Sequence, residues 1–313
     1  MERGGIMRLL VLGDLHITGK QPKGRIDQVN ATQFSKLSFA FKKGANEGVS
    51  AALQPGDFFD SDKCSNDLLQ YTIRFFKQLN IKVYVTLGQH DMRYHSGSVN
   101  DSPLSVLEAS GVVEIVKGCQ QISTGVQLYA APWGNSTLPD IDYDYTGASI
   151  LLTHRMIIHK KKLWSKQEDY TEAESLLKKT EYDLIVSGDN HQNFHAVRDS
   201  RYLINCGSLM RSTTAQIDHR PAFYIYNTES KTAKRYFYPI KPPGEVFDLQ
   251  YIEAVEKKKE KTEWSQAFLQ HVRKNTAVSG LDYKLNMKRY ISKNENVLHS
   301  ATIKILEKNM EEI

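Results

Sequence analysis

Short apolar runs that end abruptly in small or polar residues recur through the first three quarters of this chain. They cover residues 7–12, 49–53, 83–87, 150–152, 184–186 and 202–204. Such continuous runs are typical of strands buried on both faces, as in a sheet that is covered by helices. Helical periodicity at residues 32–47 and 66–79 separates the early runs. Strands that alternate with helices predict a layered α/β fold.

Further strands are expected at residues 126–131, 222–226 and 234–238, the last two as a hairpin. The pattern changes after Pro242-Pro243-Gly244, and from about residue 252 Lys and Glu dominate. We therefore predict a main domain at residues 1–243 and a helical C-terminal extension at residues 244–313. The sparse apolar residues of the extension include Trp264, Phe268 and Leu269. Its helices either pack on the main domain or dock a partner.

Side chains that can bind metal ions follow five of the predicted strands. They are Asp14 and His16, Asp57, Gln89 and His90, His154, and Asp189 with His191. Side chains at the carboxyl ends of strands emerge at one edge of a sheet, where open α/β folds bind ligands. Because five strand ends carry such residues, we expect these side chains to converge on one site.

The chemistry of these donors indicates the kind of metal. Carboxylates are hard donors, imidazoles are intermediate and an amide oxygen is neutral, a mixture that suits Mn, Fe, Zn or Mg. The cysteines Cys64, Cys119 and Cys206 show no CxxC or CxH spacing, which argues against a zinc finger and a disulfide framework. Two divalent ions about 3.5–4 Å apart can clamp a phosphoryl group for in-line attack. A nearby His can protonate the leaving oxygen.

The ordered set of motifs resembles that of the calcineurin-like metallophosphoesterases. The resemblance rests on Asp14-Leu15-His16, Gly56-Asp57-Phe58-Phe59-Asp60, Gly88-Gln89-His90-Asp91, His154 and Gly188-Asp189-Asn190-His191. Each motif is weak alone, but the ordered set is specific and spans residues 7–238. It implies the family's fold, in which β-sheets are sandwiched by helices and the metal site lies at the carboxyl ends of strands.

The resemblance also implies a role for each residue. One divalent metal ion would be held by Asp14, His16, Asp57 and His191. Asp57 would bridge to a second ion, completed by Gln89, His154 and Asp189. His90 would be the general acid that protonates the leaving oxygen, and Asp60 would orient His90 by a hydrogen bond. Asp91 would brace its loop rather than bind metal.

The chain departs from the family pattern at two positions of the second metal site. Gln89 stands where the family usually has Asn, and Asp189 stands where it usually has His. Gln89 still supplies an amide oxygen. Asp189 is a harder, negatively charged donor, which favours Mn or Mg. The alternative is a degraded second site.

Local features favour one branch of the family. Residues 202–211 and the opening Leu12-Gly13-Asp14-Leu15-His16 resemble the SbcD-type DNA double-strand-break repair nucleases, which pair with a coiled-coil ATPase of the SbcC type. This resemblance implies a metal-dependent DNA exonuclease or endonuclease that acts in repair, recombination or replication, with Mn as the favoured metal. The residues expected to contact DNA are Arg93, Tyr94, Lys160, Lys161 and Arg211.

Bulk properties leave other functions open. The net charge of +5 permits a polyanionic partner without establishing one. The apolar runs are shorter than the roughly 18 residues that cross a bilayer, so we expect no membrane association. The scattered, odd-numbered cysteines indicate a reducing cytoplasm. A homodimer is a further candidate assembly. A small-molecule or cyclic-nucleotide phosphodiesterase would need a narrower pocket. A catalytically weakened protein-binding scaffold is the other alternative, against which the retained ligands weigh.

Overall fold

The computed structural model describes residues 7–93, 99–142, 144–160, 162–163, 167–213, 216–255, 257, 266, 283–296 and 298–311. The chain divides into two compact units, Met1–Phe247 and Asp248–Ile313. Every residue of the expected metal site lies in the first unit.

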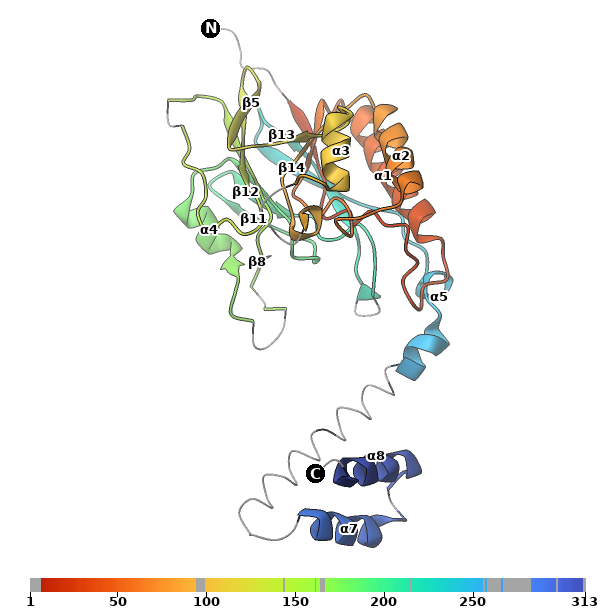
Figure 1. Cartoon of the computed structure of the whole chain (residues 1–313). Coiled ribbons are helices and arrows are strands. Elements are labelled where there is room, and N and C mark those ends of the chain that lie inside the picture. Colours follow the sequence, from red (N-terminus) through yellow and green to blue (C-terminus); the bar gives the residue numbers. More distant parts are fainter. Residues whose placement is uncertain are drawn as a thin grey trace. The chain divides into compact units, whose positions relative to one another are not determined.

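Two six-stranded sheets form the centre of the first unit (Figure 1). The first sheet has the order β14-β13-β1-β2-β3-β4, with bounds Thr232–Phe237, Ala222–Asn227, Arg8–Val11, Ala51–Gln54, Lys82–Val85 and Glu114–Ile115. The second has the order β11-β12-β10-β7-β6-β5, with bounds Phe194–Arg198, Arg201–Asn205, Leu184–Ser187, Ala148–Thr153, Val126–Ala131 and Cys119–Ser123. A separate pair joins β8, Ile157–Ile158, to β9, Thr171–Glu172.

Parallel pairing fixes where the strands end. Strands β1 to β4 run parallel in the first sheet, and β6, β7, β10 and β12 run parallel in the second. Their carboxyl ends therefore meet at one edge of each sheet. An isolated bridge between Asp14 and Ser208 joins the loop after β1 to the segment after β12, so the two edges share one site.

Helices cover the outer faces of the two sheets. Figure 1 shows α1 (Val29–Asn46), α2 (Asn66–Lys77) and α3 (Pro103–Ala109) on one side, and α4 (Ala173–Lys179) on the other. Within β1, Leu10 packs with residues of α1 and α2, whereas Leu9 and Val11 pack between the sheets with residues such as Leu128 and Ile150. Successive strand residues point to opposite faces, and both faces are covered. This explains the continuous apolar runs.

Local signals start and end the predicted helices. The Ser65 side chain accepts a hydrogen bond from the Leu68 amide at 3.2 Å and so caps α2. Gly48 follows α1 with φ of 71°, a left-handed conformation that glycine adopts at little cost. The helix expected at residues 32–47 begins three residues earlier, and the one expected at 66–79 ends at Lys77. The predicted hairpin is confirmed as β13 and β14.

The second unit contains α7 (Tyr283–Asn294) and α8 (Ser300–Glu311). Met287, Leu306 and Met310 are buried together, with Ile291 partly buried beside them. The predicted apolar stripe of Trp264, Phe268 and Leu269 lies outside the described residues. Within the described part of the chain, no helix combines the length and apolar character that a membrane span requires. The short helix α5, Pro243–Val246, ends the first unit.

Candidate metal centre

The predicted ligands occupy loops that leave the carboxyl ends of neighbouring strands. Asp14 and His16 follow β1, and Asp57 follows β2. Gln89 and His90 lie in a short 3-10 helix, Gln89–Asp91, just after β3. His154 follows β7, and Asp189 and His191 follow β10. The structure therefore places these side chains at the shared edge of the two sheets.

Two groups of side chains have ligand atoms close enough to share a metal ion. Asp14, His16 and His191 form one group, and His16, Asp57 and His90 form the other. In each group the ligand atoms lie within 4.8 Å of one another. The Nε2 atoms of His16 and His191 are 3.1 Å apart, and Nε2 of His191 is 3.6 Å from Oδ2 of Asp14. His16 thus belongs to both groups.

Asp57 lies at the centre of the site. Its Oδ1 accepts a hydrogen bond from the His90 amide at 2.9 Å. Its Oδ2 faces three imidazoles, with distances to Nε2 of 3.3 Å for His154, 3.7 Å for His16 and 3.9 Å for His90. A carboxylate oxygen surrounded in this way is suited to bridge two cations.

The unsatisfied donors and acceptors fit a metal site. Among the described residues, buried side-chain atoms without a hydrogen-bond partner include Asp14 Oδ1, His16 Nδ1, Asp57 Oδ2, Gln89 Oε1 and His154 Nε2. Buried polar atoms are normally paired, because an unpaired one costs about 1–3 kcal/mol. All five belong to the predicted ligands; Nδ1 of His16 faces Asp60 instead of the centre, and the other four atoms can bind divalent cations. The donor set therefore fits the divalent ions that the motifs imply.

The electrostatics of the centre also favours cations. Burial raises the pKa of Asp14 well above its ordinary value, opposed by His154 and reinforced by Asp57. Burial would likewise raise the pKa of Asp57, but His154 and then His16 lower it to about 2. Burial opposes charge on His154, yet the Asp57 carboxylate raises the pKa of His154 to about 10. A divalent ion bound here would replace such protons, since metal ligands must be deprotonated.

The two unusual ligands contact each other. Nε2 of Gln89 donates a hydrogen bond to Oδ1 of Asp189 at 3.2 Å. The amide oxygen of Gln89, Oε1, has no hydrogen-bond partner and keeps its lone pairs for a metal ion. The Asp189 amide donates to Oδ2 of Asp14 at 3.0 Å. His154 and Asp189 line one cavity of about 380 Å³. Gln89 and Asp189 are therefore in direct contact, and Asp189 shares a cavity with His154.

His90 is held by a backbone atom. Its Nδ1 lies 2.8 Å from the carbonyl oxygen of Asp60, so the imidazole donates from Nδ1 and presents Nε2 to the site. The Asp60 carboxylate lies instead beside His16, with Oδ1 3.6 Å from Nδ1. The predicted orienting contact of Asp60 with His90 is thus made through the main chain.

Asp91 and two glycines hold the loops together. Asp91 accepts hydrogen bonds from the Phe58 and Gly88 amides, both at 3.0 Å, and so ties the loop after β2 to the loop after β3. A Cβ atom at Gly88 would lie 2.1 Å from Oδ1 of Asp57. A Cβ atom at Gly56 would lie 2.6 Å from Nδ1 of His154. Only glycine allows the ligands to approach this closely.

The residues expected to contact DNA have different surroundings. Lys160 is exposed, and Arg93 is partly buried beside the His90 loop. Tyr94 and Lys161 lie outside the described residues. Arg211 is 4% exposed, and its guanidinium donates to the carbonyl oxygens of Ile217 at 3.2 Å and Lys241 at 2.7 Å. Arg211 is therefore embedded in the fold.

Sequence reasoning missed an amide that supports the His191 loop. The Asn205 side chain donates to the carbonyl oxygens of Asn190 and Gln192, both at 2.6 Å. Asn190 in turn donates to the Ile157 carbonyl at 2.7 Å. The only sequence signal was a buried strand, β12, that ends in an amide rather than an apolar residue.

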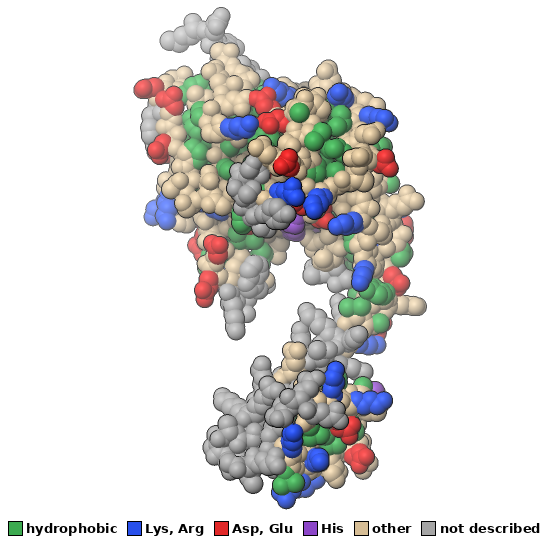
Figure 2. All heavy atoms as spheres, viewed as in Figure 1, with side chains coloured by type: hydrophobic (Ala, Val, Ile, Leu, Met, Phe, Trp, Pro, Cys, Tyr) green, Lys and Arg blue, Asp and Glu red, His purple; other side chains and the backbone are tan. Residues whose placement is uncertain are grey.

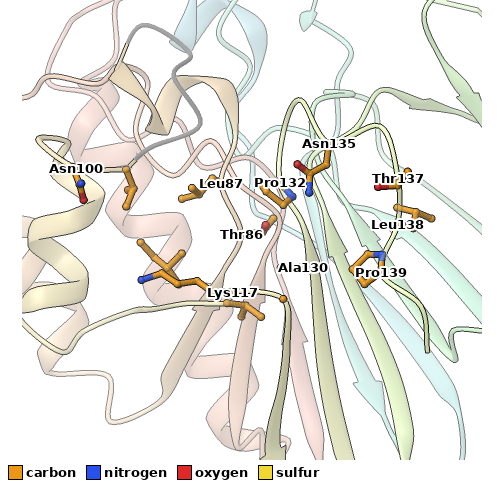
Figure 3. Close-up of a pocket in the computed structure, with 14 residues that line it drawn as sticks. Thr86, Leu87, Asn100, Lys117, Ala130, Pro132, Asn135, Thr137, Leu138 and Pro139 are labelled. Atoms are coloured by element: carbon orange, nitrogen blue, oxygen red, sulfur yellow. The ribbon is translucent and has the colours of Figure 1, made fainter. Parts of the chain in front are cut away.

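A second cavity shares a lining residue with the cavity of His154 and Asp189. It has a volume of about 600 Å³ and lies between the ends of β3 and β6, where Leu87, Pro132 and Leu138 line it (Figure 3). Asn135 lines both this cavity and the one that contains His154 and Asp189. Asn135, in the loop after β6, is thus shared by both cavities, whereas none of the predicted metal ligands lines the larger one.

Comparisons with known proteins agree with this geometry. The sequence profile of the calcineurin-like phosphoesterases matches residues 7–193, more than half of the chain. The chain belongs to this family. The α/β fold with two sheets between helices, predicted from the motifs, is the metallophosphoesterase fold and is confirmed. The chain is thus a member of the metallophosphoesterase hydrolase family, whose fold implies divalent metal ions at the His and Asp groups described above.

Two kinds of relatives were found. The DNA double-strand break repair protein Mre11 of Halobacterium salinarum is 23% identical over 222 residues, which cover 68% of this chain and 54% of that protein. The chain thus spans about half the length of this curated relative. Solved structures similar to the chain include an archaeal phosphodiesterase, at 16% identity and a TM-score of 0.41, covering 74% of this chain and 99% of that one. A dimetal phosphatase from Danio rerio has 8% identity and a TM-score of 0.44, with the same two coverages.

Proposed function

We propose that this phosphoesterase is a metal-dependent nuclease that hydrolyses phosphodiester bonds in DNA by a two-metal mechanism. The observation that carries the proposal is the position of Asp57, whose Oδ2 faces His16, His90 and His154 within 3.9 Å. A single carboxylate among three imidazoles supports a proposal in which Asp57 would bridge two metal ions and a neighbouring histidine would donate a proton to the same substrate.

Each residue of the centre has a proposed task. Asp14, His16, Asp57 and His191 would hold one divalent ion, and Asp57, Gln89, His154 and Asp189 would hold the other. Bound metal ions would lower the pKa of a water molecule and neutralise charge on the phosphoryl oxygens. His90 would protonate the leaving oxygen through Nε2, because its Nδ1 proton is held by the Asp60 carbonyl. Mn or Mg is the metal that the hard donor Asp189 favours.

Support for DNA as the substrate comes from similarity. The Halobacterium relative is described as a DNA double-strand break repair protein. Figure 2 shows Lys and Arg side chains among Asp and Glu side chains on the visible face of the first unit, so charge alone does not mark a DNA surface there. Lys160 and Arg93 are the described residues near the motifs that would contact phosphates. Arg211 is unsuited to this role because it is embedded in the fold.

The second unit is proposed to bind a coiled-coil ATPase of the SbcC type. Its helices α7 and α8 expose Leu285, Tyr290 and Ile305, with exposed fractions of 45%, 37% and 42%. Apolar side chains left exposed on a helix pair suit docking to a partner helix. A homodimer is proposed as the other assembly, and a cytoplasmic location as the setting.

A comparison of substrates tests the proposal. The purified chain is given end-labelled single- and double-stranded DNA, a cyclic nucleotide and bis-nitrophenyl phosphate, each with Mn or Mg. We expect metal-dependent cleavage of DNA with a kcat/KM well above that for the cyclic nucleotide. A preference for the cyclic nucleotide would instead assign the site to a small-molecule phosphodiesterase. Loss of all cleavage with intact metal binding would assign it to a scaffold.

A further inference from the structure

A cavity separate from the metal ligands contains three buried cationic side chains. The cavity has a volume of about 620 Å³ and lies among the start of α1, the segment after β14 and α5. Arg25, Lys36 and Arg211 line it, with exposed fractions of 7%, 6% and 4%. None of the predicted metal ligands lines this cavity.

The negative charge in this cavity does not balance the cations. Asp27 is the buried carboxylate, and Arg25 engages both of its oxygens, Nε to Oδ1 at 2.9 Å and a terminal nitrogen to Oδ2 at 2.6 Å. Lys36 donates to the Leu209 carbonyl at 2.8 Å. Among the described residues, no carboxylate forms an ion pair with Lys36 or Arg211. At the rim of the cavity, the positive charge of Lys241 and the negative charge of Glu245 balance each other, and both side chains are exposed.

Buried cations without anionic partners are costly, because carbonyl dipoles replace water only in part. The pKa values agree with this interpretation. Burial, followed by the charges of Arg211 and Arg25, lowers the pKa of Lys36 to about 7. Burial, followed by Arg25, also lowers the pKa of Arg211. An anion bound in the cavity would stabilise the positive charges of Lys36 and Arg211.

Helix α1 adds to the positive potential. Its first turn lies at the cavity, where Gln28, Ala31 and Thr32 are lining residues. Gln28 is the N-cap residue and makes no side-chain cap hydrogen bond, but the Val29 amide donates to Oε1 of Gln21 at 3.3 Å and the Thr32 hydroxyl donates to Asp27 at 2.8 Å. The amino end of this 18-residue helix therefore contributes its dipole to the cavity, although Asp27 and Gln21 already accept two of its donors.

We propose that this cavity binds an organic phosphomonoester, with the phosphate group between Lys36, Arg211 and the start of α1. Lys36 uses one of its three donors on a carbonyl, and Arg211 uses two of its five. The remaining donors suit a phosphate dianion. The wall formed by Ile26, Ile240 and Val246 suits the organic part, and the volume is that of an ordinary ligand pocket rather than of a bare ion.

The same cavity touches the backbone that supports the metal centre. Lys36 binds the Leu209 carbonyl, and the Leu209 amide donates to the Asp14 carbonyl at 2.9 Å. The proposal does not depend on which phosphoester the metal centre cleaves. Its ligand could be a free nucleotide or the 5′-phosphate of a strand, since both present the same group.

Calorimetry on the metal-loaded full chain tests the proposal. The probes are a deoxynucleoside 5′-monophosphate, the matching nucleoside and inorganic phosphate, titrated into the unmodified chain, Lys36→Met and the control Lys42→Met. Lys42 is exposed on the same helix and does not line the cavity. We expect the monophosphate to bind the unmodified chain and Lys42→Met alike. Lys36→Met should weaken it at least tenfold, and the nucleoside should bind at least tenfold more weakly.

If the monophosphate binds only at the metal centre, Lys36→Met and the unmodified chain will bind it with equal affinity. That result would overturn the proposal. So would failure of the monophosphate to bind. Lys241→Gln provides a second test at the exposed rim, where folding is not at risk, with an expected loss of two- to threefold. Oligonucleotides with 5′-phosphate and 5′-hydroxyl ends then identify the source. If the 5′-phosphorylated strand binds the unmodified chain but not Lys36→Met, the natural ligand is a strand end. If the nucleotide binds but the phosphorylated strand does not, the natural ligand is a free nucleotide.

Discussion

Nε2 of His154 lies 3.3 Å from Oδ2 of Asp57, although the two residues follow strands of different sheets. Nδ1 of His154 is fixed by the Pro55 carbonyl at 2.8 Å, so the imidazole can present only Nε2 to the centre. This contact joins the two halves of the metal site. It makes Asp57 the residue on which both proposed ions depend.

Replacing His90 should impair chemistry more than metal binding. General acid catalysis is worth about 10²–10⁴ in rate, and we expect His90→Ala to lose that much phosphodiester cleavage while both metals stay bound. Activity and elemental metal content are measured together. The control His299→Ala removes an exposed histidine of the second unit and should change neither. Loss of a metal ion from His90→Ala would make His90 a ligand, and full activity would remove it from the mechanism.

Asp189→His should shift the metal preference from Mn or Mg towards Zn. An imidazole at this position is a softer donor than a carboxylate, and it would release the Gln89 amide that Asp189 now holds. Cleavage of a model diester is measured across Mg, Mn and Zn. Asp199→His is the matched control, because Asp199 also has a positive φ but lies exposed in the turn between β11 and β12. The same metal profile in Asp189→His and the unmodified chain would refute the role of Asp189 as a ligand.

Much of the metal centre followed from the sequence because its ligands stand at strand ends. The end of each strand can be recognised in the sequence, because an apolar run changes there to polar residues. Asp14, Asp57 and His154 could therefore be placed together at the ends of strands. The hydrogen bond from His90 to Asp60 uses a backbone carbonyl, which has no signature in residue type. Arg211 was expected at the DNA because it follows a Gly-Ser segment, but the packing of residues 25–36 against it could not be seen in one sequence.

The buried Lys36 predicts a pH dependence of stability in phosphate-free buffer. Burial and then the charges of Arg211 and Arg25 lower the pKa of Lys36, whereas Asp27 raises it, with a resulting pKa of about 7 in the folded chain. His219 also interacts with the Lys36 charge. The unfolded lysine has its ordinary pKa near 10.5. Between these values the unfolded chain binds more protons, so stability rises with pH. Below pH 7 Lys36 is charged in the folded chain as well, so the buried charge lowers the free energy of unfolding by its full amount.

Lys36→Met removes this contribution. Each pKa unit corresponds to about 1.4 kcal/mol, so the variant should be more stable than the unmodified chain by a few kcal/mol at pH 6. The difference should shrink towards pH 10. Urea unfolding at both pH values measures it. A difference that is independent of pH would show that Lys36 keeps its ordinary pKa in the folded chain.

Removal of the second unit should leave the metal centre intact. A chain truncated after Pro243 keeps every predicted ligand, and we expect it to bind two metal ions and cleave bis-nitrophenyl phosphate. It should no longer co-purify with a co-expressed SbcC-type ATPase. The truncation also removes Val246 and Phe247, which are buried residues of the first unit itself, so a second truncated chain that ends at Phe247 is the control. Loss of metal from both truncated chains would make the C-terminal unit part of the catalytic core.

The most direct test of the central claim is cleavage of end-labelled DNA by the unmodified chain and by Asp57→Asn, with Mn, with Mg and with a chelator. Asp57→Asn keeps the shape of the side chain but removes the charge that two cations would share. The two-metal nuclease predicts labelled products only from the unmodified chain and only with metal. Equal cleavage by Asp57→Asn, or cleavage of bis-nitrophenyl phosphate without any cleavage of DNA, would contradict it.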